Sequence, residues 1–254
     1  MKLLKAMAIA FSIYSKIPVP QFEWKEEDME YMMCFFPWIG GVIGMFFFGW
    51  AVLCEKFAVG NVCYALIGAA IPLMISGGFH VDGYMDTMDA FHSYQSREKK
   101  LEILKDSHIG AFAAIMLALY YMIDIAAISE IHTRKAVFAL AAVFFLARCF
   151  SGIAVMTLQS AKKEGLLYTF ASSAQKVRVK AALYFQTVLC VVLMLLVSGW
   201  YGAAAIGAAL LSFFYFKKKS YKELDGITGD TAGFFVTVCE AAAAAAVAVA
   251  GHFL

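Results

Sequence analysis

The stretch SGGFHVDGYMDTMDAF occupies residues 76–91, and the segment KDSHIG follows it at residues 105–110. Asp82, Asp86 and Asp89 are spaced i, i+4 and i+7, so in a helix they share one face. Carboxylates this close repel one another and lose hydration when buried, so a divalent cation among them would stabilise the arrangement. Oxygen ligands without a neighbouring cysteine or histidine pair are typical of a hard ion such as Mg²⁺. The spacing therefore predicts a magnesium site.

The alternative for these three acids is an ordinary solvated helix face, which is the usual role of such spacing in a charged soluble protein. The background here is different. Only 19 of the 254 residues are Asp or Glu, and the three acids directly follow an apolar run. We therefore favour the cation site.

The composition indicates an integral membrane protein. Hydrophobic residues make up 62% of the chain and charged residues 16%, with a mean hydropathy of +0.73, whereas about a quarter of the residues in soluble domains are charged. Runs of about 20 apolar residues cross a bilayer as helices, because lipid offers the backbone no hydrogen-bond partner. We expect an all-α, polytopic bundle, a single domain over 1–254, with about seven membrane helices at 34–54, 60–79, 110–131, 136–157, 181–199, 203–216 and 231–253.

The segments before the first span are predicted separately. Residues 1–15 carry two lysines before a short apolar run, and no small-x-small cleavage site closes it. We expect a retained helix, embedded in the membrane or at its interface. Residues 21–33 are rich in acids and are expected to form a solvated helix.

The basic residues predict the orientation. If the 80–109 loop is cytoplasmic, so are 1–33, 158–180 and 217–230, which gives 17 basic residues inside and 3 outside, with Arg148 within a span.

The net charge of +2 and the scatter of the basic residues argue against nucleic acid as a partner. A pore or transporter would bury polar groups near the midplane. Away from the ends of the spans, only Asp124, Arg148 and Glu240 are charged, and each is either a functional group or a partner of another charge inside the bundle.

Carboxylates at a membrane surface, with glycines and lysines nearby, are suited to handling a diphosphate. Metal ions that bridge acids and phosphoryl oxygens stabilise the charge that develops as a P–O bond breaks. Gly77 and Gly78 would allow the backbone to approach phosphate, although such a pair also serves helix packing. His80, His92 and His108 lie near the acids without a partner at metal-ligand spacing, so structural roles are favoured, and His80 is the one to test for a direct role.

These motifs resemble those of the cobalamin synthase family, the adenosylcobinamide-GDP ribazoletransferases. The resemblance covers nearly the whole chain and rests on GGFHVDGYMDTMD at 77–89 with KDSHIG at 105–110. Supporting segments are KIPVP at 16–20, KEGL at 163–166 and TGD at 228–230, near the last span. Departures from the usual residues, none of them a proposed metal ligand, are Lys16, Ala90, Ala113 and Asp225.

The resemblance implies a Mg²⁺-dependent transferase of the bacterial or archaeal cytoplasmic membrane, with its active site facing the cytoplasm. It would join adenosylcobinamide-GDP to α-ribazole or its 5′-phosphate, releasing GMP, late in vitamin B12 biosynthesis. The implied metal ligands and catalytic acids are Asp82, Asp86, Asp89 and Asp106, and His80 is a further catalytic candidate. The implied substrate-binding residues are Gly77, Gly78, Lys105, Ser107, Lys163, Thr228 and Asp230.

Two alternatives stay open from the sequence. A CDP-alcohol phosphotransferase or a prenyltransferase also places aspartates on membrane helices, but the CDP-alcohol pattern requires Asp-Gly-x-x-Ala-Arg, and here Asp86-Thr87 stands in place of Ala-Arg. A cation transporter would carry metal across vesicles and would release no GMP. Thr228 and Asp230 likewise have a simpler interpretation, as an ordinary helix cap.

Overall fold

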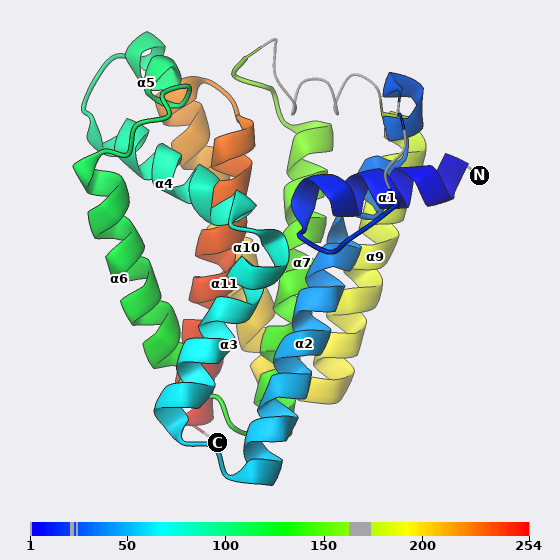
Figure 1. Cartoon of the computed structure of the whole chain (residues 1–254), viewed down its shortest axis with the longest axis vertical. Helices are drawn as coiled ribbons and strands as arrows, with labels where there is room; N and C mark the ends of the chain where they lie inside the picture. The colour runs from blue at the N-terminus through cyan, green and yellow to red at the C-terminus, as the bar shows by residue number, and fades with distance from the viewer. Residues whose placement is uncertain (1, 21–22, 24, 163–173, 254) are drawn as a thin grey trace.

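The computed structural model describes residues 2–20, 23, 25–162 and 174–253. The described chain is helical, without a β-strand, and one isolated bridge pairs Ser160 with Ile227. Seven helices run along the long axis of the molecule (Figure 1): α2 (Phe36–Phe57), α3 (Asn61–Ser76), α6 (Ala111–Ile128), α7 (Arg134–Thr157), α9 (Lys176–Ser198), α10 (Trp200–Leu224) and α11 (Gly229–Gly251). The shorter helices are α1 (Lys2–Tyr14), α4 (Phe79–His92) and α5 (Arg97–Ile103), with 3-10 turns η1 (Glu26–Met29) and η2 (Met32–Cys34).

The all-α membrane bundle predicted from the sequence is confirmed. In the described residues, α2, α6, α7, α9 and α11 are long and apolar enough to cross a membrane, and α3 with α4 would make a sixth span if the bent pair counts as one. The expected number of seven is therefore not confirmed. Helix α10 has 25 residues, but its last turns are rich in lysine, and it is not one of the five.

The span predicted over 60–79 ends early, at Ser76. Gly77 and Gly78 adopt φ angles of 67° and 86°, a left-handed conformation that glycine takes without steric penalty. Helix α4 then leaves at 96° to α3 and crosses one end of the bundle (Figure 1). The three aspartates therefore lie on a separate helix that begins at Phe79.

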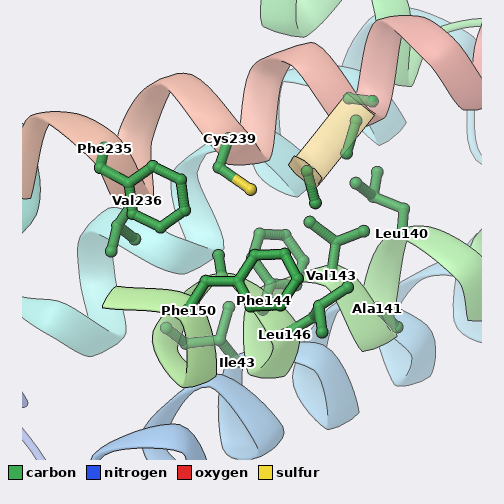
Figure 2. Close-up of a cluster of buried hydrophobic side chains, with 14 of the residues drawn as sticks. Ile43, Leu140, Ala141, Val143, Phe144, Leu146, Phe150, Phe235, Val236 and Cys239 are labelled. Carbon is green, nitrogen blue, oxygen red and sulfur yellow. The ribbon is translucent and has the colours of Figure 1, made fainter. Parts of the chain in front are cut away.

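The core forms where α7 packs between α2 and α11. A Cβ atom at Gly40 or Gly44 would clash with carbonyl oxygens of α7, so these glycines allow close helix contact, as their spacing predicts. Figure 2 shows Ile43 of α2, Phe144 of α7 and Cys239 of α11 in this core. Close packing here gives the end of the bundle that carries α4 a rigid support.

Two of the charged residues within the spans bind each other. Arg148 of α7 donates a hydrogen bond of 2.7 Å to Oε1 of Glu240 of α11, and both side chains are buried. Arg148 also donates to the Phe144 carbonyl oxygen. Asp124 of α6 is also buried, close enough to Glu240 for the charge of Glu240 to act on it. The pair joins two central helices, which supports the structural alternative for Arg148 and Glu240.

The segment before α2 differs from its prediction. The solvated helix expected over 21–33 is replaced, in the described residues, by the turns η1 and η2. Met32 and Met33 are buried in the core, so the end of this segment is not a solvated surface. Helix α1 lies across the same end of the bundle as α4 (Figure 1). Its 13 residues are too few to span a bilayer, which takes about 20, and this agrees with an interfacial or embedded helix.

Candidate active site

Helix α4 crosses the first turns of α11 at very short range. A Cβ atom at Gly83 would lie 2.8 Å from the carbonyl oxygen of Asp230, and one at Gly233 would lie 3.1 Å from that of His80. A side chain at Gly83 would force the two helices apart, and one at Gly233 would be tightly confined. The crossing brings Asp230 to the acids of α4, and we call Asp82, Asp86, Asp89 and Asp230 the acidic cluster.

Asp86 lies at the electrostatic centre of the acidic cluster. Burial raises the pKa of this half-buried carboxyl to about 7, and the negative charges of Asp82, Asp230 and Asp89 add to the effect. Among the described residues, no hydrogen bond or ion pair reaches Asp82 or Asp86. Two like charges one helical turn apart, with no cationic partner among the described residues, are an arrangement that a bound cation would stabilise.

Asp89 has a structural task that the sequence did not reveal. Its Oδ2 accepts a hydrogen bond of 2.6 Å from the backbone N–H of Gly110, and its Oδ1 accepts one of 2.8 Å from Ala113. These groups begin α6, whose own N-cap residue has no side chain, so Asp89 caps α6 from another helix. The contact joins the two motifs of the sequence, and each oxygen keeps a lone pair for a metal ion.

The other polar residues of the KDSHIG loop are exposed. The exposed Asp106 accepts hydrogen bonds from the backbone N–H and from Nδ1 of His108, at 3.0 and 2.6 Å, and these bonds lower its pKa. Asp106 is not one of the carboxylates that act on Asp86. Lys105 and Ser107 are exposed in the same loop. The structure thus connects this loop to the acidic cluster through Asp89 and not through Asp106.

His80 lies inside the protein rather than on the acid face. Its side chain is 5% exposed, and neither ring nitrogen has a hydrogen-bond partner among the described residues. The ring stacks on Tyr14, with 6.2 Å between centroids, and borders a small cavity of about 40 Å³ with Ser151 of α7. Residues two apart on a helix do not face each other, so His80 and Asp82 point in different directions. This location favours a positioning role for His80.

The start of α11 is held by its own cap and by a neighbouring loop. Thr228 accepts a hydrogen bond of 3.1 Å from the Thr231 N–H and donates its backbone N–H to the Thr231 hydroxyl, so Thr228 is a helix cap. The backbone of Ile227 pairs with residues 159–161, which brings Lys162 close enough to attract Asp230 electrostatically. Of the predicted substrate-binding residues, Lys163 lies outside the described part of the chain.

An open pocket of about 520 Å³ borders the acidic cluster at Asp82. It lies between the end of α1, the Gly77–Gly78 turn, α4 and α6, and its size is typical of small-molecule sites. Both predicted glycines line it, as does Lys16, the first residue of the KIPVP segment. No spacing rule connects Lys16 to residues 60 positions later, so only the folded chain reveals this neighbour.

The donor set fits Mg²⁺ shared with a substrate better than a metal held by protein alone. In the described residues, no three Asp, Glu, His or Cys side chains converge closely enough to bind a metal ion. Mg²⁺ commonly keeps several waters and binds through one or two carboxylates plus substrate phosphates. Asp82, which lines the pocket, and Asp86, one helical turn further along α4, offer carboxylates of this kind.

Comparison with known proteins agrees with this site. The profile of the family described as Cobalamin-5-phosphate synthase matches residues 6–248. A relative from Lachnoclostridium phytofermentans is 44% identical, over 98% of this chain and 95% of its own length. Relatives from Clostridium botulinum strain Alaska E43 (30% identical, 94% of each chain) and Fusobacterium nucleatum (27%, 92% and 94%) are similar too, and all three are named adenosylcobinamide-GDP ribazoletransferase. No solved structure matches. The chain therefore belongs to the cobalamin-5-phosphate synthase family.

Proposed function

We propose that the protein joins adenosylcobinamide-GDP to α-ribazole or its 5′-phosphate, with release of GMP, in a reaction that requires Mg²⁺. The names of the relatives support the two substrates. The observation that carries the metal requirement is Asp86, half-buried among three other carboxylates and without a cationic partner in the described residues, with Asp82 one helical turn away lining a ligand-sized pocket.

Asp82 and Asp86, one helical turn apart, are the residues best placed to hold Mg²⁺ together with substrate phosphates, and Asp230 across the helix crossing adds negative charge beside them. Bound there, the ion would neutralise charge on the diphosphate and on the departing GMP. A ribose hydroxyl of α-ribazole attacks the phosphorus attached to cobinamide, a carboxylate of the acidic cluster takes its proton, and the P–O bond to GMP breaks. Asp89 and Asp106 remain proposed ligands, Asp89 with its added task as the cap of α6.

We further propose that the α4 end of the bundle faces the cytoplasm of a bacterial or archaeal cell. The described parts of the segments counted as internal begin or end at this end of the molecule, as Figure 1 shows for α1, α5 and the start of α11. The turn between α2 and α3 lies at the opposite end (Figure 1). Nucleotide-linked substrates would then reach the pocket from the side where they are made.

The alternative functions find no support in the comparisons. Each relative described above is named as a ribazoletransferase, and none is named as a lipid-forming transferase or a transporter.

The direct test uses the full chain in nanodiscs with adenosylcobinamide-GDP, α-ribazole and Mg²⁺. We expect a cobalamin product and GMP in equal amounts, and loss of both when EDTA removes the metal. Asp86→Asn should abolish turnover, whereas Glu102→Gln, on the exposed surface of α5, should keep it. Absence of product from a folded protein, or full turnover in EDTA, would contradict the proposal.

A further inference from the structure

Lys16 is held over the turn between α3 and α4. Its backbone N–H donates a hydrogen bond of 2.8 Å to the carbonyl oxygen of Ile75, the residue before the last one of α3. Its side chain runs across Gly77, where a Cβ atom would clash with the methylene carbons of the lysine. The missing side chain at Gly77 therefore leaves the space that the Lys16 side chain occupies. This gives Gly77 a role beyond its left-handed φ angle.

The charge of Lys16 is available to a ligand. Lys16 and Asp82 line the same pocket, but they form no ion pair with each other. Among the described residues, no carboxylate lies within ion-pair distance of the Lys16 ammonium group, which is at an exposed position. The pocket thus has a cation on one wall and a carboxylate on another, with room for a ligand between them.

We propose that the Lys16 ammonium group binds the diphosphate of the nucleotide-linked substrate in this pocket, on the side away from the acidic cluster. The proposal rests on the proposed function. A diphosphate carries several negative charges, and a metal ion on the carboxylates neutralises them from one side only. Lysine serves as a point charge for phosphate, and a hydrogen bond to a charged group is stronger than a neutral one. Lys16 therefore selects for the substrate that contains a diphosphate.

The binding test uses GDP as the probe, titrated calorimetrically into the full chain in nanodiscs with Mg²⁺. Lys16→Gln keeps the packing over Gly77 but removes the charge, and should raise the Kd for GDP about tenfold or more. Lys16→Arg keeps the charge and should stay within about threefold of the unaltered protein. Lys218→Gln, an exposed lysine of α10, is the matched control and should leave the Kd unchanged.

A turnover assay separates the two substrates. Lys16→Gln should raise the KM for adenosylcobinamide-GDP and leave the KM for α-ribazole, which has no diphosphate, within about twofold. A purely structural role for Lys16 would affect both. In Gly77→Ala, the added methyl group displaces the Lys16 side chain, so this variant should reproduce the rise in KM for the GDP-linked substrate.

Three results would overturn the assignment of Lys16. The first is a Kd for GDP that is the same in Lys16→Gln as in the unaltered protein. The second is an equal rise of this Kd in Lys16→Gln and Lys16→Arg. The third is the absence of saturable GDP binding by the unaltered protein. The proposed function fails separately, if no cobalamin forms. In that case a charge-dependent loss of GDP affinity in Lys16→Gln would still establish a diphosphate site.

Discussion

The Asp89 carboxylate has two roles, as the cap of α6 and as a member of the acidic cluster. Both of its oxygens accept backbone hydrogen bonds from the start of α6, and it also belongs to the acidic cluster that acts on Asp86. Asp86 has no such bonds in the described residues. The spacing of these acids along the helix therefore does not show that their roles differ. Asp89 positions a neighbouring helix, whereas Asp86 is held among like charges.

This difference predicts opposite effects on stability. Asp89→Ala should lower the free energy of unfolding by about 1–2 kcal/mol, because α6 loses its cap. Asp86→Ala should leave stability equal or higher, because it removes a carboxylate repelled by its neighbours. Thermal unfolding in one detergent measures both, and turnover should be lost in both. Unchanged unfolding of Asp89→Ala would show that the cap contributes nothing.

The pKa of Asp86, raised to about 7 mainly by burial, predicts that Mg²⁺ activation depends on pH. The carboxyl binds a proton below pH 7, and a proton and a metal ion compete for the same oxygens. The Mg²⁺ concentration for half-maximal turnover should therefore rise as pH falls from 8 to 6. Steady-state rates across a Mg²⁺ series at each pH measure it, and a midpoint independent of pH would count against Asp86 as a ligand.

At the scale of helices, the long apolar runs were sufficient to predict α2, α6, α7, α9 and α11 to within a few residues. The break between α3 and α4 was missed, because the apolar run continues into Phe79 and hydropathy does not record φ angles. Gly77 and Gly78 were predicted as a phosphate contact or a packing contact, and the structure shows that they end the span. The prediction of a solvated helix over 21–33 was wrong, because it relied on the acidic residues and did not account for the two methionines at the end of the segment, Met32 and Met33, which are buried.

The candidate site was predictable only where it is local in sequence. Helical spacing placed Asp82 and Asp86 on one face, and the structure confirms that they lie on one helix. The approach of Asp230 depends on the close crossing of Gly83 and Gly233, and the place of Lys16 depends on the turn after α3. Such contacts join residues more than 60 positions apart, which no periodicity reports.

The buried pair between α7 and α11 predicts strong coupling. Arg148→Met should cost about 3–5 kcal/mol, because it leaves the Glu240 carboxylate buried without a partner. The double variant Arg148→Met with Glu240→Leu should recover most of that loss, because no charge is then left unpaired. Thermal unfolding of the two single variants and the double variant measures the coupling. Additive losses would mean that the two side chains do not depend on each other.

At the scale of the whole molecule, the chemistry is concentrated at one end of the bundle. Helices α1, α4 and α5 lie there, and the α2–α3 turn lies at the other end (Figure 1). Single cysteines at the exposed positions Gln95 and Lys218 should be labelled from the cytoplasmic side, and one at Lys135 from the opposite side. The exposed Cys63 must first be replaced by serine. Labelling of Gln95→Cys from outside intact cells would invert the orientation.

The central claim is that the acidic cluster at the α4–α11 crossing binds the catalytic metal ion together with the diphosphate. Electron paramagnetic resonance of Mn²⁺, used in place of Mg²⁺, tests it most directly. In the presence of adenosylcobinamide-GDP, the full chain should bind Mn²⁺ saturably, Glu102→Gln should bind it equally, and Asp86→Asn should lose the bound signal. Equal Mn²⁺ binding by Asp86→Asn and the unaltered protein would contradict the account.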